Sequence, residues 1–161
     1  MREPALLWEH RAGGPITTIP VIASGGIVLA GSADHRLYCL ELGNGVLRWT
    51  HATRGPVRSS PAVGPDSTVY LGSGEGALYA LDPITGGVRW TFRIARAART
   101  AEEAHASSSA TDGPVNPSVG GPSAGPDGMV YAPASDRRLY AVEGGTGRLR
   151  WSIDLTCATP V

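Results

Sequence analysis

The chain of 161 residues is long enough for one ordinary domain, and its 14 basic and 14 acidic residues leave no net charge. All the basic residues are Arg, and they are interspersed with acids, so the sequence offers no positive stripe to a nucleic acid. Charged residues make up only 17% of the chain, which excludes a charge-rich disordered protein and a long coiled coil. No apolar run approaches the roughly 20 residues that a transmembrane helix needs.

The chain begins with a short apolar stretch, Ala5–Trp8, that is followed at once by polar residues. A signal peptide needs an apolar core of about 7–15 residues, so none is expected here, and the sequence leaves the compartment open. Residues Leu6–His10 have instead the pattern of a single outer strand that carries Trp8. We assign residues 1–14 to the end of a preceding repeat.

A repeat of about 41 residues runs through the chain. Trp8, Trp49 and Trp90 follow one another at intervals of 41 residues, and Trp151 follows after 61. Each of the last three closes a segment that aligns with the other two without a gap. Self-similarity at this period is typical of propellers and solenoids. The three segments are Leu37–Trp49, Leu78–Trp90 and Leu139–Trp151.

Each repeat contains four short strand patterns separated by turn residues. In the second repeat these patterns are Ser60–Val63, Thr68–Gly72, Ala77–Asp82 and Val88–Phe92. The Pro-Asp pair within Gly64–Ser67 favours a β-turn between the first two. The middle strands, such as Ile27–Ala30, are almost wholly apolar, so we expect both of their faces to be covered. Four antiparallel strands at this period predict the blades of a β-propeller.

The repeat predicts an all-β partial propeller, an arc of three complete four-stranded blades with single strands at its ends. Three blades are fewer than the four to eight that close a ring, so the arc is a piece of a longer protein or a protomer that completes a ring by association. The expected divisions are 1–14 (outer strand of a preceding blade), 15–54 (blade 1), 55–94 (blade 2), 95–120 (inserted loop or short helix), 121–155 (blade 3) and 156–161 (start of a further inner strand).

The longer third interval indicates an insertion between blades 2 and 3. Gly14–Ile16 and Gly55–Val57 each begin six residues after a Trp, and we match them with Gly113–Val115, which begins 23 residues after Trp90. Most of the extra residues are therefore placed before Gly113. The composition of Ala95–Ala106 fits a short helix and a surface loop equally well.

The segment that ends at each Trp resembles the tryptophan-docking motif of quinoprotein-type propellers, the pyrroloquinoline-quinone-like repeat. That motif reads Ala-x-Asp-x-x-Thr-Gly-x-x-x-Trp, and the second repeat matches it in full. The third repeat has Glu for Asp, and the first has Cys, Glu and Asn for Ala, Asp and Thr. The resemblance covers nearly the whole chain outside the insertion. The motif residues are Trp8, Cys39, Glu41, Asn44, Gly45, Trp49, Ala80, Asp82, Thr85, Gly86, Trp90, Ala141, Glu143, Thr146, Gly147 and Trp151.

Each residue type in the motif has a structural interpretation. A Trp buries on the order of 200 Å² and can dominate the contact between two blades. We expect Ala80 and Ala141 to leave room for an indole of the adjacent blade. Gly86 is expected to take a positive φ in its turn, and Asp82 to accept hydrogen bonds from the amides of that turn. WD-repeat propellers share the period, but their Trp-Asp pair is absent here.

The sequence predicts no catalytic, cofactor or metal site. The quinone-dependent dehydrogenases of the resembled family hold a quinone and calcium in a central funnel, where a carboxylate acts as base. The expected inner strands of this chain carry no acid and no aromatic ring, and no spacing of His or Cys predicts a metal. A calcium ion needs six to eight oxygens, whereas four isolated Asp residues are interpreted as turn caps, namely Asp34, Asp66, Asp127 and Asp136.

The preferred interpretation is a non-catalytic binding or scaffold module that acts through ring-face loops and edges. The alternative is a piece of a quinone-dependent alcohol or sugar dehydrogenase, which would bring PQQ and calcium as cofactors. The expected partners are the remaining blades of a larger propeller or another protein, with self-association through open blade faces as a further route. Nucleic acid is not expected as a partner. The resembled propellers are often extracytoplasmic, and the fold alone does not choose between these functions.

Overall fold

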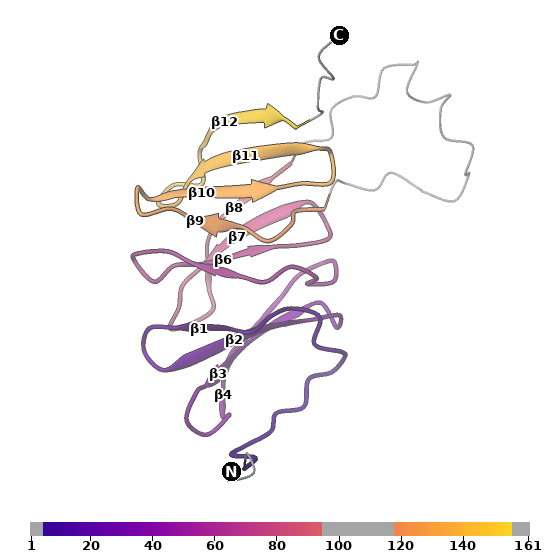
Figure 1. Cartoon of the computed structure of the whole chain (residues 1–161), viewed down its shortest axis with the longest axis vertical. Helices are drawn as coiled ribbons and strands as arrows, with labels where there is room; N and C mark the ends of the chain where they lie inside the picture. Colours follow the sequence, from indigo (N-terminus) through magenta and orange to yellow (C-terminus); the bar gives the residue numbers. More distant parts are fainter. Residues whose placement is uncertain (1–4, 95–117, 156–161) are drawn as a thin grey trace, which may run out of the picture.

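A computed structural model of the chain describes residues 5–94 and 118–155. These residues form three four-stranded antiparallel sheets that follow one another along the longest axis of the molecule (Figure 1). Within each sheet the strands are paired in sequence order, so each strand is hydrogen-bonded to the one that precedes it. This is the all-β architecture of a partial propeller that the repeat predicted.

Each sheet is one blade. Blade 1 consists of β1 (Val21–Ala23), β2 (Ile27–Ser32), β3 (Arg36–Glu41) and β4 (Leu47–Ala52). Blade 2 consists of β5 (Ala62–Val63), β6 (Val69–Gly72), β7 (Ala77–Leu81) and β8 (Val88–Arg93). Blade 3 consists of β9 (Ser123–Ala124), β10 (Met129–Pro133), β11 (Arg138–Glu143) and β12 (Leu149–Asp154).

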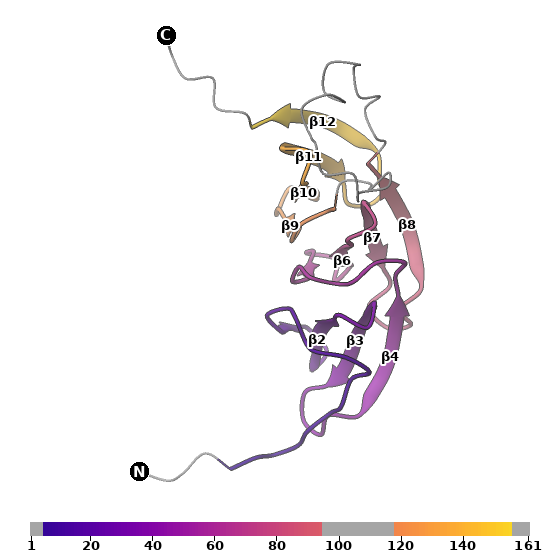
Figure 2. The ribbon, with the colours of Figure 1, turned by 90° about the vertical axis from the view of Figure 1, so that its right-hand side faces the viewer.

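The blades fan out along an arc that does not close. In Figure 2 the outer strands β4, β8 and β12 follow one edge of the arc, and the inner strands lie toward the other edge. The described residues include no helix, and so none that could cross a membrane. The arc therefore has two terminal blade faces, one on blade 1 and one on blade 3.

The middle strands of blades 1 and 2 are buried because both of their faces meet a neighbour. Every residue of β2, β6 and β7 is buried, whereas β12 is exposed along its whole length. Burial on both faces explains why these strands read as continuous apolar runs rather than as an alternating pattern. In blade 3 only Val130 and Ala132 of the middle strand β10 are buried, so this blade lacks the cover that β2 and β6 have.

Two apolar cores lie between the blades. The first joins Leu29 and Leu37 of blade 1 to Val57 and Leu71, which belong to blade 2. The second joins blade 2 to blade 3 and contains Leu78, Ala80, Val130 and Val142, among others. At about 25 cal/mol for each Å² of apolar surface removed from water, these two interfaces supply much of the driving force that holds the blades together.

The structure assigns no strand to Leu6–His10, against the sequence-based expectation. A strand needs a partner strand for its backbone N–H and C=O groups, and the described residues provide none beside this segment. Trp8 is half-buried against blade 1, but the apolar pattern of the segment does not by itself create a ladder. The expectations for 95–117 and 156–161 lie outside the described residues.

The end of the insertion also differs from the prediction. The N–H of Val57 donates to the carbonyl of Ser32 over 3.2 Å, and the N–H of Val119 donates to that of Ser73 over 3.1 Å. Val119, and not Val115, therefore takes the place that Val57 has in blade 2. The Gly-Pro-Val similarity was misleading, because this position needs an apolar residue that bonds to the preceding blade rather than a particular tripeptide.

Candidate functional site: the tryptophan turns and the open face of blade 3

Each blade is joined to the one before it by an indole that lies on a glycine. Trp49 of blade 1 lies on Gly86 of blade 2, where an added Cβ would meet the indole Cε3 at 2.6 Å. Trp90 of blade 2 lies in the same way on Gly147 of blade 3. Both glycines have positive φ, 70° and 73°, a conformation that disfavours other residues. Glycine is therefore required both by the backbone and by the indole.

The indole N–H fixes the position of each Trp along the turn. Nε1 of Trp49 donates to the carbonyl of Pro83 over 3.0 Å, and Nε1 of Trp90 donates to that of Gly144 over 2.7 Å. Both acceptors lie three residues before the glycine that the ring covers. A buried Trp needs a partner for its N–H, so this hydrogen bond sets a register that apolar packing alone would leave free.

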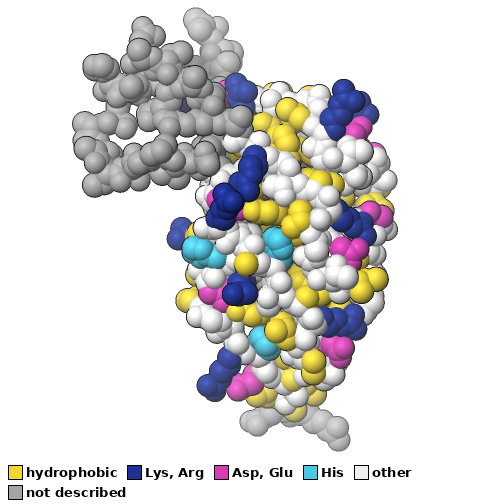
Figure 3. All heavy atoms as spheres, turned by 180° about the vertical axis from the view of Figure 1, so that it is seen from behind, with side chains coloured by type: hydrophobic (Ala, Val, Ile, Leu, Met, Phe, Trp, Pro, Cys, Tyr) yellow, Lys and Arg dark blue, Asp and Glu magenta, His cyan; other side chains and the backbone are white. Residues whose placement is uncertain are grey.

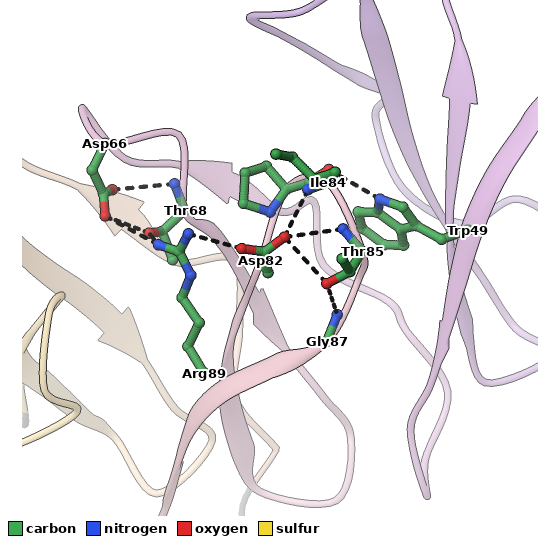
Figure 4. Close-up of polar contacts among 9 residues, drawn as sticks. Trp49, Asp66, Thr68, Asp82, Ile84, Thr85, Gly87 and Arg89 are labelled. Carbon is green, nitrogen blue, oxygen red and sulfur yellow. Dashed lines mark hydrogen bonds and ion pairs between the residues drawn. The ribbon is translucent and has the colours of Figure 1, made fainter.

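The turn that receives Trp49 is held rigid by one carboxylate (Figure 4). Oδ1 of Asp82 accepts hydrogen bonds from the backbone N–H groups of Ile84 and Thr85, each over 3.0 Å, and Oδ2 accepts from Arg89. Oγ1 of Thr85 in turn accepts from the N–H of Gly87. These bonds, with those to Thr85 first, lower the pKa of Asp82 to about 2. The carboxylate is therefore ionised at any physiological pH.

The turns of blades 3 and 1 have Glu in place of Asp82, and the turn of blade 1 also has Asn44 in place of Thr. In blade 3 the Thr146 hydroxyl donates to Glu143, which also pairs with Arg150. In blade 1 the side-chain amide of Asn44 donates to Glu41 over 2.9 Å. Glu41 and Glu143 accept hydrogen bonds from side chains, whereas Asp82 accepts directly from the turn amides. One extra methylene thus moves the carboxylate out of reach of the backbone.

The small residue of the motif has a different neighbour from the predicted one. Ala80 is paired across the ladder with Trp90 of its own blade, and Ala141 is paired likewise with Trp151. Both alanines are completely buried. The expectation that Ala80 and Ala141 make room for the indole of the adjacent blade is therefore wrong. They lie opposite the Trp of their own sheet, and the residue beneath the incoming indole is the glycine of the turn.

The face of blade 3 that points away from blade 2 has no cover from the described residues. Trp151 is 47% exposed and Ile153 is 52% exposed, whereas Trp49 is only 8% exposed. The ring of Trp151 packs on Tyr131 with centroids 5.9 Å apart, as Trp90 packs on Tyr70 over the same distance. The side chains that would meet a next blade are therefore already arranged as they are at an occupied interface.

The opposite face of the arc is covered by the N-terminal segment, residues 5–14. Trp8 packs with Ala12 against the cluster of Val28, Tyr38 and Leu40 on blade 1. Nε1 of Trp8 donates to the carbonyl of Leu42 over 2.9 Å, so the contact repeats the one that Trp49 makes with blade 2. The two ends of the arc therefore differ, because the N-terminal segment caps blade 1 whereas residues 5–94 and 118–155 include no cap for blade 3.

A second repeated contact was not identified from the sequence. In each blade a Tyr hydroxyl of the third strand donates to a carboxylate four residues earlier in the chain. Burial first, and then this carboxylate, raise the pKa of Tyr79 and of Tyr140 to about 12. The signal was present, since a Leu-Tyr pair recurs in all three aligned segments. The pairs are Tyr38 with Asp34, Tyr79 with Glu75, and Tyr140 with Asp136.

The carboxylates that line the hollow between blades 2 and 3 already have hydrogen-bond partners in the chain. A hollow of about 340 Å³ between the turns of blades 2 and 3 contains the carboxylates of Asp66 and Asp127. Asp66 already accepts from Thr68 and Arg89, and Asp127 accepts from the N–H of Met129. Within the described ranges no three His, Cys, Asp or Glu side chains come together as metal ligands.

One polar group inside the arc lacks a hydrogen bond. His51 on β4 packs edge-on against Tyr79 of blade 2, with centroids 5.1 Å apart, and its Nε2 is buried without a partner in the described structure. Phe92 holds the corresponding place in blade 2 and packs against Tyr140. Burial lowers the pKa of His51 below its ordinary value of 6.5. A histidine thus occupies a position that the repeat fills with an apolar ring.

Residues 4–119 match the sequence model of a family described as outer membrane protein assembly factor BamB, whose members are built from PQQ-like repeats. The match spans more than half of the chain and includes the turns of blades 1 and 2. The chain belongs to this PQQ-like β-propeller family. No curated protein sequence matches the chain.

Solved structures share the fold of this PQQ-like chain at low sequence identity. BamB from Moraxella catarrhalis superposes with a TM-score of 0.70 at 20% identity, over 91% of this chain and 39% of its own. The quinohemoprotein alcohol dehydrogenase ADHIIG from Pseudomonas putida HK5 gives 0.70 at 18% identity, over 92% and 22%. The WD40 repeats of RRP9 give 0.71 at 11% identity, over 89% and 40%. The chain thus spans about two fifths of BamB and less of the dehydrogenase.

The docked and the open Trp provide a matched pair of substitutions. Trp49→Ala removes a buried ring and its hydrogen bond, and we expect it to lower the free energy of unfolding by about 3–5 kcal/mol. Trp151→Ala removes an exposed ring, and we expect a loss under about 1 kcal/mol. Urea unfolding followed by circular dichroism in dilute protein measures both. Equal losses would contradict the assignment of Trp151 to an uncovered face.

His51 should make the protein sensitive to mild acid. Because burial lowers the pKa of His51 in the folded state, the unfolded chain binds a proton more readily below about pH 6.5. We therefore expect the free energy of unfolding to fall as the pH drops from about 6.5 to 5. In His51→Phe this fall should become smaller, and stability at neutral pH should rise by about 1 kcal/mol.

The exchanged variant Phe92→His is the control for His51→Phe. It places an imidazole at the equivalent position between blades 2 and 3, so it should lower stability and increase the loss in acid. Denaturant titrations at several pH values measure both variants. A pH dependence that His51→Phe leaves unchanged would assign it to another group.

Proposed function

We propose that the chain is a non-catalytic binding module that acts through its blade faces, edges and loops. The observation that supports this most is the open face of blade 3, where Trp151 and Ile153 are about half exposed on the face that corresponds to the interface covered by the next blade at Trp49. Exposed apolar patches of this kind mark interaction sites. The outer edge of β12 is paired with no other described strand, and its backbone groups can meet a partner strand.

The charges of the chain serve its own turns rather than a substrate. Asp82, Asp66 and Asp34 each accept hydrogen bonds from residues within a few positions in the sequence. Arg and acidic side chains alternate over the face seen in Figure 3 and do not gather by sign. A site for a charged ligand would need such groups to point together at one place, so a protein partner that presents apolar surface fits better.

The second candidate is a piece of a quinone-dependent dehydrogenase. It is raised by the likeness in fold to the quinohemoprotein alcohol dehydrogenase. This likeness is one of fold alone, at 18% sequence identity. Because BamB has the same type of blade, the likeness does not favour the enzyme over the binding module. The residues that would hold a quinone would have to come from other blades.

One pair of experiments separates the two candidates. Calorimetric titration of the chain with pyrroloquinoline quinone and Ca²⁺ should give no saturable heat, whereas micromolar binding would favour the dehydrogenase. In the second arm, a displayed peptide library is selected on the chain. Peptides that bind should lose at least about tenfold in affinity for Trp151→Ala, which is the effect of about 1.4 kcal/mol. Selected peptides that bind Trp151→Ala equally well would contradict a role for the open face.

A further inference from the structure

We propose that a second copy of this chain covers the open face of blade 3, using its own blade 1, in a head-to-tail contact. This rests on the proposed function, because it names the partner of the same open face. The partner is expected to dock as blade 2 docks on blade 1, with Trp151 of one copy lying on Gly45 of the next.

The open face of blade 3, here called the tail, carries its indole in the same arrangement as the two occupied interfaces. Trp151 pairs with Ala141 on the adjacent strand, as Trp49 pairs with Cys39 and Trp90 with Ala80. Its ring is held by Tyr131 in the manner of an occupied interface. The missing part is a turn with a glycine of positive φ and a carbonyl three residues earlier. No described residue of the same copy supplies it.

The face of blade 1 that Trp8 covers, here called the head, carries such a turn. Gly45 has a φ of 70°, as Gly86 has, and its Cβ position is filled by the ring of Trp8. The carbonyl of Leu42 accepts the Trp8 indole N–H, as that of Pro83 accepts the N–H of Trp49. The turn of blade 1 is therefore built to receive an indole, and Trp8 shows that it does so.

The present cover of the head is weaker than a blade. The segment that carries Trp8 has no strand, and Leu6 and Leu7 beside it are 78% and 87% exposed. An incoming blade 3 would bring a whole sheet face in addition to its indole. Since only one indole can lie on Gly45, the second copy must displace Trp8. The N-terminal segment thus acts as a replaceable cap that lowers the apparent affinity between copies.

The two ends also carry the positions that make backbone hydrogen bonds between neighbouring blades. Between blades the N–H of Val57 bonds to the carbonyl of Ser32, and that of Val119 bonds to Ser73. Ile16 holds the place of Val57 at the head, and Ala134 holds the place of Ser32 at the tail. Both chains have no net charge, so no long-range repulsion opposes the approach.

This contact is heterologous, because a different surface is used on each copy. Such a contact leaves one free head and one free tail after each addition, so it forms a ring or an open row rather than stopping at a dimer. Sedimentation velocity of the unmodified chain should therefore show species larger than a dimer as the protein concentration rises. A chain that remains monomeric at all concentrations would overturn the proposal.

Two single variants disable one end each. Gly45→Ala places a methyl group where the indole must lie, and Gly43→Ala, whose Cβ would have nothing within 4 Å, is its control. Trp151→Ala removes the ring from the tail. Gly45→Ala and Trp151→Ala are each expected to be monomeric alone, and Gly43→Ala should associate as the unmodified chain does. Near-ultraviolet circular dichroism and a cooperative melt establish that each variant is folded.

Mixing the two disabled variants gives the decisive result. Gly45→Ala retains its tail and Trp151→Ala retains its head, so together they should form a 1:1 dimer that cannot grow. If Gly45→Ala alone still dimerises, the contact is tail-to-tail and the proposal is overturned. If the mixture stays monomeric while the unmodified chain associates, the head-to-tail register is wrong.

A substitution in the N-terminal segment tests the proposal independently. Trp8→Ala should lower the concentration at which half of the chains associate by about tenfold or more, because the turn of blade 1 no longer has to be cleared. The double variant Trp8→Ala with Trp151→Ala should remain monomeric. Unchanged or weaker association of Trp8→Ala would contradict the exchange of one indole for another. A monomeric chain whose open face still binds selected peptides would end this proposal and leave the proposed function standing.

Discussion

The contact on which this structure depends is an indole seated on a glycine of the next blade. The ring buries apolar surface, and its N–H gives a direction to that burial by bonding to one carbonyl. The glycine is needed twice over, since the turn requires a positive φ and the ring leaves no room for a Cβ. Because the same contact recurs at each junction, every blade is positioned by its neighbours and not by a single central core.

The repeated contact has a consequence for the ends of the arc. A blade inside the array has both faces covered, whereas a terminal blade must be capped or left open. Blade 1 is capped by the segment of Trp8, and blade 3 leaves Trp151 exposed. The two terminal blade faces of the described residues thus differ in what covers them.

The fold could be predicted from the sequence because one period controls strand length, turn chemistry and burial together. The four-stranded blades and the three turns follow from the spacing of Trp49, Trp90 and Trp151. The strand expected around Trp8 does not form, since pairing depends on a partner that periodicity does not provide. The site was less predictable. The place of Ala80 depends on which face of the sheet points to which neighbour, and the pairing of Tyr79 with Glu75 depends on side-chain geometry that spacing alone suggests but does not fix.

The exchange rates of the four indole N–H protons test the central claim most directly. They can be resolved by nuclear magnetic resonance of the ¹⁵N-labelled chain in dilute solution. The account predicts slow exchange with water for Trp49 and Trp90, which are bonded between blades, faster exchange for Trp8 in its cap, and the fastest for Trp151. Four similar rates, or protection of Trp151 greater than that of Trp49, would contradict the serial seating of indoles on glycines.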